Sequence, residues 1–94
     1  MSDGFNPFSL DGKRVLVTGA TSGLGRAIAI SCARIGAEVI GVGRDAQRLS
    51  DTEQALAAAS SRPHRMLRAD LTQPADRDAL VAALGGPIDG VVHS

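Results

Sequence analysis

Short runs of β-branched residues alternate with longer runs rich in alanine and leucine along this chain. The short runs predict buried strands, and the longer runs place apolar residues at helical spacing. The strands are expected at residues 14–18, 38–43, 65–69 and 88–93. The helices are expected at residues 23–35, at about 46–60, and from Thr72 and Pro74 to Leu84.

Local signals at the helix ends support these boundaries. Gly36 follows the first helix, at a position that often requires a left-handed residue, and Asp45 is expected to cap the second helix. Asp76 and Asp78 are expected in the first turn of the third helix, where the helix dipole favours acidic side chains. One face of the first helix carries four residues at helical spacing: Leu24, Ile28, Ser31 and Ile35.

The alternation of strands and helices predicts the fold class. Helices long enough to cross over a sheet imply an α/β fold with parallel strands and helices on the faces of the sheet. Right-handed crossovers favour the strand order 3-2-1-4, which is the N-terminal half of a doubly wound nucleotide-binding fold. The continuous apolar segment 15–17 suits a central strand that is buried on both faces.

A glycine-rich segment, residues 18–25, joins the first strand to the first helix. Gly19 allows a sharp exit from the strand, Gly23 leaves room for a pyrophosphate, and Gly25 lets helix and strand pack closely. The helix N-terminus offers N–H groups and partial positive charge to the phosphates. A P-loop is excluded because no lysine follows the glycines. The alternative is a glycine-rich turn that binds no ligand.

Composition narrows the classes of partner and location. The 94 residues allow one small domain, and ten basic and ten acidic residues give no net charge. We therefore expect neither nucleic acid nor a membrane as a partner. The absence of a signal-like N-terminus and the single Cys32, expected in the core, favour a cytoplasmic location. His64 is expected at the surface, and no residues are spaced to bind a metal.

Several segments resemble the short-chain dehydrogenases/reductases. The segment Thr18-Gly-x-x-x-Gly-x-Gly25 is similar to the cofactor motif of that family. The lead-in from Phe8 to Lys13, the Asp-Leu-Thr at 70–72 and the segment 89–94 resemble further family motifs, in the same order. The resemblance implies that residues 1–94 are part of an NAD(P)-binding Rossmann domain, truncated after the fourth strand.

The end of the second strand bears on which cofactor is bound. In this fold an acid there binds the ribose 2′-hydroxyl of NAD and repels the 2′-phosphate of NADP. Here Gly43 has that position and Arg44 follows, with a guanidinium that matches a phosphate; Ser22 could add a hydroxyl donor. We therefore expect NADP rather than NAD. The alternative is that Arg44 is a solvated surface residue and that Asp45 turns toward the ribose.

The resemblance also implies contacts to the adenosine. Asp70 is expected to bind the adenine amino group, with the backbone of Leu71 beside it; the alternative is that Asp70 only caps the following turn. His93 and Ser94 stand where the family usually has two asparagines, and His93 is expected to border the ribose through its backbone. The expected cofactor-binding residues are Gly19, Ala20, Thr21, Ser22, Gly23, Leu24, Gly25, Arg44, Asp70, Leu71 and His93.

Residues for the family's chemistry are not found in this sequence. The family uses a Tyr-x-x-x-Lys pair and an upstream serine, and the chain contains no tyrosine. No catalytic residue is therefore assigned, and the chain is expected to supply the adenosine and pyrophosphate half-site of an NADP-dependent oxidoreductase. The parent enzyme is expected to be a homo-oligomer that transfers hydride between NADP(H) and a carbonyl or alcohol. The alternative is a non-catalytic dinucleotide-binding module or sensor.

Overall fold

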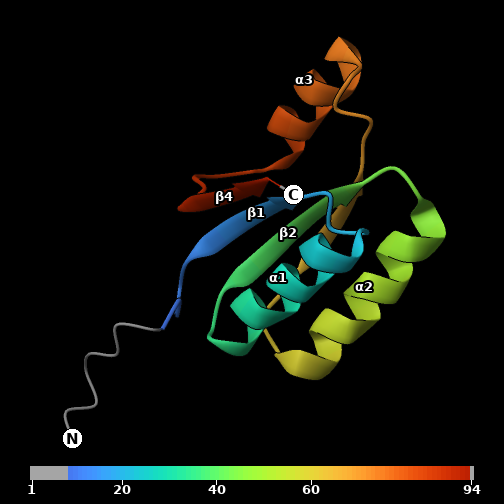
Figure 1. The fold of residues 1–94 in the computed structure, drawn as a ribbon. Helices are drawn as coiled ribbons and strands as arrows, with labels where there is room; N and C mark the ends of the chain where they lie inside the picture. Colours follow the sequence, from blue (N-terminus) through green and yellow to red (C-terminus); the bar gives the residue numbers. More distant parts are fainter. Residues whose placement is uncertain (1–8, 94) are drawn as a thin grey trace, which may run out of the picture.

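The computed structural model describes residues 9–93 and shows the expected alternation of strands and helices (Figure 1). Phe8 and Ser94, which take part in the family resemblance, lie outside the described residues. The strands are β1 (Arg14–Thr18), β2 (Glu38–Gly43), β3 (Arg65–Arg68) and β4 (Gly90–His93). The helices are α1 (Gly23–Arg34), α2 (Ala46–Ala59) and α3 (Pro74–Ala83). The predicted elements are confirmed, with small differences at their ends.

The strands form one parallel sheet in the predicted order, β3-β2-β1-β4. The register places Thr18 of β1 beside Val42 of β2 and His93 of β4, and it places Gly43 beside Arg68. The carboxyl ends of the parallel strands therefore meet at one edge of the sheet. The direction of winding reverses between β1 and β4, and open α/β sheets bind ligands at such a switch point.

Two apolar clusters hold the sheet between its helices. On one face, Val15 and Val17 of β1 pack with Leu56 and with alanines of α1. On the other face, Leu16 packs against a cluster that contains Leu80 of α3. Figure 1 shows the same arrangement, with α1 and α2 on one side of the sheet and α3 on the other. β1 is therefore covered on both faces, as its continuous apolar segment predicts.

The side of α1 that faces the sheet is a row of small residues. Gly25, Ala29 and Ala33 are buried, whereas Leu24 is 68% exposed and Ile35 is 42% exposed. The face with the larger apolar residues, which helical spacing singles out, is therefore not the face that packs on the sheet. Small side chains let the helix axis lie close to the strands, and larger ones at these positions would push it away.

The ends of the helices follow the local signals in most cases. Gly36 has φ +105°, which only glycine adopts without strain, and the Asp45 carboxylate caps α2 by accepting from Arg48 N–H at 3.1 Å. In α3 only Asp76 lies in the first turn, because the helix begins at Pro74 with Gln73 as its cap. Asp78 lies further along the helix.

Arg14 connects four segments at the amino edge of the sheet, and sequence patterns did not indicate it. Its Nε donates to the Glu38 carboxylate of β2 at 3.2 Å, and its Nη atoms donate to the carbonyls of Leu84 at 2.7 Å and Pro87 at 3.2 Å. Its backbone N–H donates to the Asp89 carboxylate at 2.8 Å. One half-buried guanidinium thus fixes the end of α3 and the approach to β4 against β1 and β2.

The surface position predicted for His64 is wrong. Its side chain is half-buried, Nδ1 accepts from the Val39 N–H at 3.0 Å, and Nε2 is buried without a partner among the described residues. Pairing of β2 with β3 begins only at Ile40. The imidazole therefore accepts a hydrogen bond from an N–H group of β2 that precedes the paired positions. Burial lowers the pKa of His64, and the nearby Glu38 carboxylate opposes this by a smaller amount.

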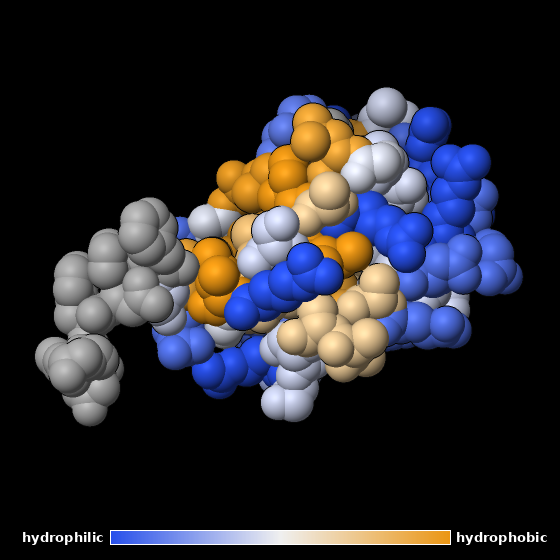
Figure 2. Space-filling view, turned by 60° about the horizontal axis from the view of Figure 1, so that its bottom comes forward, coloured by the Kyte–Doolittle hydropathy of each residue, from blue (hydrophilic) through white to orange (hydrophobic). Residues whose placement is uncertain are grey.

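Some apolar surface remains outside the core. Figure 2 shows apolar side chains gathered in orange patches on one face, with charged side chains around and between them. The large hydrophobic side chains with high exposure are Leu24, Ile35, Val81 and Val91. None of the helices in residues 9–93 is long and apolar enough to cross a membrane.

We expect His64 to make the fold less stable in acid. Its folded-state pKa lies below the ordinary value of 6.5, so the neutral ring is favoured in the fold. Its contribution to the free energy of unfolding is complete above pH 6.5 and is lost as the pH falls through the lower folded-state pKa. Urea unfolding of the chain at neutral pH and at about pH 5 measures this loss.

The matched control is His64→Asn, whose amide oxygen can accept from Val39 N–H without titrating. This variant should lose less stability than the wild type between the two pH values. An equal loss in both proteins would contradict the role of His64.

Candidate functional site

A hollow of about 400 Å³ opens at the edge of the sheet where the strands end. It lies where the winding direction reverses, between the turn after β1 and the end of β4. Seven of the expected cofactor-binding residues line it: Gly19, Thr21, Ser22, Arg44, Asp70, Leu71 and His93. The fold therefore brings together residues from segments that are far apart in the sequence.

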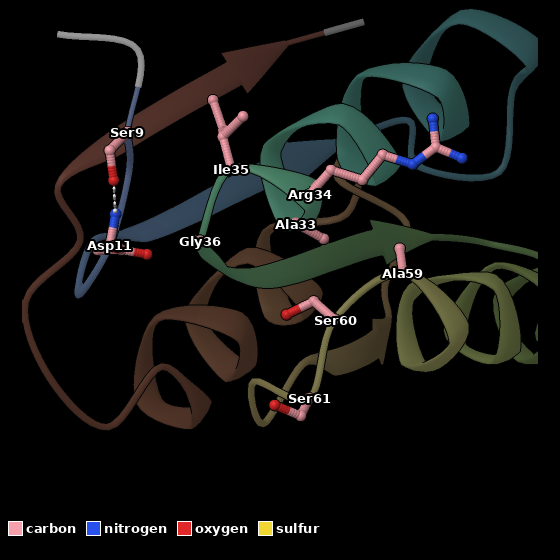
Figure 3. A pocket seen from close by; sticks show the side chains of 9 residues that line it. All are labelled: Ser9, Asp11, Ala33, Arg34, Ile35, Gly36, Ala59, Ser60 and Ser61. Carbon is pink, nitrogen blue, oxygen red and sulfur yellow. Dashed lines mark hydrogen bonds between the residues drawn. The ribbon is translucent and has the colours of Figure 1, made fainter. Parts of the chain in front are cut away.

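A larger hollow, of about 490 Å³, lies at the opposite end of α1 (Figure 3). Its walls include Ala33 and Arg34 at the end of α1, Ala59 at the end of α2, and the segment before β1, where Ser9 Oγ accepts from Asp11 N–H at 3.2 Å. Helix carboxyl ends carry partial negative charge, which disfavours phosphates. The hollow at the strand ends is therefore the better candidate for a nucleotide site.

The turn after β1 is held by its backbone. Gly19 leaves the strand with φ +70°, a left-handed conformation. The Ala20 N–H then donates to the Val42 carbonyl at 3.0 Å, and the Thr52 hydroxyl of α2 donates to the Ala20 carbonyl at 3.3 Å. Ala20 is fully buried. It packs beneath the surface of the turn and does not line the hollow.

Ser22 closes the turn against the start of α1. Its hydroxyl donates to the Gly19 carbonyl at 2.8 Å and accepts from the Gly25 N–H at 3.1 Å. The hydroxyl donor that was expected to face the cofactor is thus used within the turn. A Cβ on Gly25 would overlap the Gly19 carbonyl oxygen, whereas a Cβ on Gly23 would meet nothing within 4 Å. The close packing predicted for Gly25 is therefore confirmed as a backbone contact.

The first turn of α1 presents unpaired donors beside this hollow. Ser22 accepts from the Gly25 N–H through its hydroxyl and from the Arg26 N–H through its carbonyl, and the N–H groups of Gly23 and Leu24 have no acceptor among residues 9–93. Both residues are exposed. Free N–H groups at a helix N-terminus, together with the helix dipole, form a favourable place for an anion.

The end of β2 carries a basic residue and no acid. Gly43 is buried, and a Cβ there would lie 2.7 Å from the methyl group of Thr21. Arg44 follows with an exposed side chain that lines the hollow. Asp45 instead turns its carboxylate to Arg48 N–H and caps α2. The structure therefore does not support the alternative in which Asp45 faces the hollow.

Asp70 both caps a turn and faces the hollow. Its Oδ1 accepts from the Thr72 hydroxyl at 2.6 Å and from the Thr72 N–H at 3.0 Å. The Asp70 N–H in turn donates to the Asp76 carboxylate at 2.8 Å. The Thr72 hydrogen bonds, helped by the charge of Arg44, lower the pKa of Asp70. The carboxylate is therefore ionised and held in place, with Oδ2 free of hydrogen bonds from the described residues.

His93 joins the two strands at the switch point. Its Nδ1 lies 2.7 Å from the Thr18 hydroxyl of β1, which is a cross-strand hydrogen bond at the paired positions Thr18 and His93. An asparagine usually has this place in the family that the sequence resembles. The imidazole thus supplies a side-chain link between β1 and β4 at the floor of the hollow.

A family model described as short chain dehydrogenase matches residues 13–94. The chain belongs to the short-chain dehydrogenase family. It is 49% identical over 90 residues to 2-keto-3-deoxy-L-fuconate dehydrogenase of Xanthomonas campestris, which covers 89% of this chain and 28% of that protein. It is 36% identical over 93 residues to gluconate 5-dehydrogenase of Gluconobacter oxydans, which covers 93% of this chain and 35% of that protein. The chain therefore spans about a third of the length of these relatives.

Solved structures of other proteins have the same fold. The Pseudomonas aeruginosa RhlG/NADP active-site complex matches with a TM-score of 0.85 and 34% identity, over 96% of this chain and 37% of that chain. L-sorbose reductase from Gluconobacter frateurii, complexed with NADPH and L-sorbose, matches with a TM-score of 0.83 and 29% identity, over 89% of this chain and 33% of that chain.

Three residues at the site of this short-chain dehydrogenase were missed by sequence reasoning. Thr72 and Asp76 fix the turn that carries Asp70. Arg68 donates from Nε to the Arg44 carbonyl at 3.0 Å. The sequence indicated Asp76 only in part, through its expected position in the first turn of the third helix. The contact of Arg68 depends on the register of β2 with β3, which no local pattern reveals.

We expect Gly25→Ala to destabilise the short-chain dehydrogenase fold by about 1–3 kcal/mol, because the added methyl group must displace the Gly19 carbonyl. Gly23→Ala is the matched control, because its methyl group enters open space and its φ is not left-handed. That variant should keep the wild-type stability or exceed it slightly. Urea unfolding of the three proteins measures the differences, and equal stability of Gly25→Ala and Gly23→Ala would contradict the proposed packing.

Proposed function

We propose that this chain is the adenosine- and pyrophosphate-binding part of an NADP-dependent short-chain oxidoreductase. The observation that carries the proposal is the pairing of two features at one edge of the sheet. The first turn of α1 has unpaired N–H groups. The end of β2 is Gly43, which has no acidic side chain, and the basic Arg44 follows it. Residues 1–94 would then be the partial Rossmann domain that the sequence predicts.

The pyrophosphate would lie against the glycine turn. The free N–H groups of Gly23 and Leu24, and the dipole of α1, would stabilise its negative charge. The open space at the Cβ position of Gly23 supports this fit, because a ligand can approach the backbone there. Gly19 and Gly25 act by shaping the turn, and the backbone of Ala20, Thr21 and Ser22 completes it.

The ribose 2′-phosphate would lie beside Arg44. The guanidinium can donate two parallel hydrogen bonds to a phosphate, and no carboxylate of residues 9–93 forms an ion pair with it. Gly43 offers no side chain for a 2′-hydroxyl. The complexes of RhlG with NADP and of L-sorbose reductase with NADPH are similar in fold to this chain and support the same choice.

The adenosine would lie between the ends of β3 and β4. The ionised Asp70 would accept from the adenine amino group through Oδ2, while Oδ1 holds Thr72. The backbone of Leu71 would lie beside the base, and His93 would border the ribose through its backbone. These groups serve NADP and NAD alike, so they set affinity and not the choice between the two cofactors.

The chemistry of the family requires more than this chain contains. A bound NADPH would supply a hydride to a carbonyl carbon, or a bound NADP⁺ would accept one from an alcohol carbon, and the protein would orient the cofactor for this transfer. The chain has no tyrosine for the family's acid–base step, so we assign it no catalytic residue. A Tyr-x-x-x-Lys pair in a longer protein that contains this chain would favour the oxidoreductase over a binding module. The cytoplasmic location and the oligomeric parent enzyme stay predictions.

We expect Arg44→Ala to weaken NADP⁺ binding by roughly 10- to 100-fold, because a charge-assisted contact to the 2′-phosphate is lost. NAD⁺ binding should change by less than about twofold, since NAD⁺ has no 2′-phosphate. Calorimetric titration of the chain with both cofactors measures the two affinities. Arg34→Ala removes an equal charge at the far end of α1 and should leave both affinities unchanged. An unchanged NADP⁺ affinity in Arg44→Ala would rule out the assignment.

We expect Asp70→Asn to weaken binding of both cofactors, by roughly tenfold, because an amide can place a donor where the adenine amino group needs an acceptor. The loss for NAD⁺ should be at least as large as that for NADP⁺, since the adenine is common to both. The same titrations apply, with the exposed Asp78→Asn as the control for charge. A loss confined to NADP⁺ would argue against an adenine contact.

A further inference from the structure

Arg68, on β3, contacts Arg44, the residue that follows β2 and that we place at the 2′-phosphate of NADP. It is the last residue of β3 and is paired in register with Gly43, the last residue of β2. Its side chain crosses the end of β2, and Nε donates to the carbonyl of Arg44 at 3.0 Å. The two strands lie side by side in the sheet, so this bond ties the loop after β2 to the end of β3.

The two arginines share a polar hollow of about 430 Å³ with Asp70 and Asp76. Neither guanidinium forms an ion pair with a carboxylate of residues 9–93. The carboxylates bind groups of the chain instead, Asp70 through Thr72 and Asp76 through the Asp70 N–H. Two guanidinium groups with no ion-pair partner among residues 9–93 thus line one hollow, and a phosphate dianion bound there would be attracted to both.

The hydrogen bond from Arg68 holds the backbone of Arg44, and the position of this backbone determines where the Arg44 side chain can extend. Arg44 is exposed, and an exposed arginine loses side-chain entropy when it binds. On its C-terminal side the backbone is fixed by Asp45, which caps α2. On its own carbonyl it is fixed by Arg68. A fixed backbone at Arg44 reduces the number of conformations that must be ordered around a phosphate.

We infer that Arg68 is a positioning residue for the discrimination between NADP and NAD, acting by holding the Arg44 carbonyl while Arg44 meets the 2′-phosphate. This inference rests on the proposed function, because it needs Arg44 at the 2′-phosphate. Cofactor specificity would then depend on a residue of β3 in addition to the residues at the end of β2.

The test compares 2′-phospho-ADP-ribose with ADP-ribose as ligands of the chain. The measured quantity is the ratio of their affinities in the wild type, Arg68→Met, Arg44→Ala and the double variant. Arg68→Met keeps an apolar stem and removes the guanidinium. It should lower the ratio roughly tenfold, as expected for one hydrogen bond from a charged donor, and leave ADP-ribose affinity unchanged. In the Arg44→Ala background the same change should have no further effect on the ratio.

A matched control is Arg48→Met, which removes another exposed arginine next to Arg44 whose side chain donates no hydrogen bond to residues 9–93. Its ratio should stay near the wild-type ratio. The inference is overturned if Arg68→Met leaves the ratio unchanged, if both ligands weaken equally, or if Arg48→Met has the same effect. It is also overturned if Arg68→Met lowers the ratio equally in the Arg44→Ala background, which would mean a direct phosphate contact.

The proposed function fails separately from this inference. If Arg44→Ala does not change the ratio, or if the wild-type chain binds neither ligand, the NADP assignment is wrong and the inference falls with it. If Arg44→Ala lowers the ratio and Arg68→Met does not, only the role of Arg68 is wrong.

Discussion

The close contact between the start of α1 and the turn after β1 is the constraint on which the rest of this structure depends. Gly25 lies so near the Gly19 carbonyl that no side chain fits between them. This contact places the N-terminus of α1 at the carboxyl edge of the sheet and aims its N–H groups away from the core. It also sets the small residues Ala29 and Ala33 against the strands, because a helix so close to the sheet leaves no room for larger ones.

The two edges of the sheet differ in how their polar groups are used. At the amino edge, the donors of Arg14 are satisfied within the protein by its four contacts, and the Val39 N–H is satisfied by Nδ1 of His64; Nε2 of His64 is buried without a partner among the described residues. At the carboxyl edge, donors of α1 and the side chain of Arg44 have no acceptor among the described residues. Unpaired donors cost stability unless water or a ligand serves them. The amino edge therefore stabilises the fold, and the carboxyl edge is free to bind an anion.

Much of this fold could be predicted because its signals are local. The glycine at position 36 and the cap at Asp45 depend only on neighbouring backbone, and both are confirmed. The order of strands follows from right-handed crossovers between parallel neighbours. The packing face of α1 could not be predicted from spacing, because spacing favours large apolar residues and the contact with the sheet needs small ones. His64 was misplaced because it follows Pro63 in a polar segment, and its partner, Val39, belongs to another strand.

The sequence by itself determined the family, the order of the elements and the residues of the glycine turn, since these depend on patterns of adjacent residues and their spacing. The tertiary structure decided which side chains meet at the site. It turned Asp45 to α2 and left Arg44 at the hollow, it gave His93 a bond to Thr18, and it brought Arg68 onto the Arg44 carbonyl. Such contacts depend on strand register, in which a shift of one residue moves a side chain to the other face. That register is fixed only when the whole sheet is assembled between its helices.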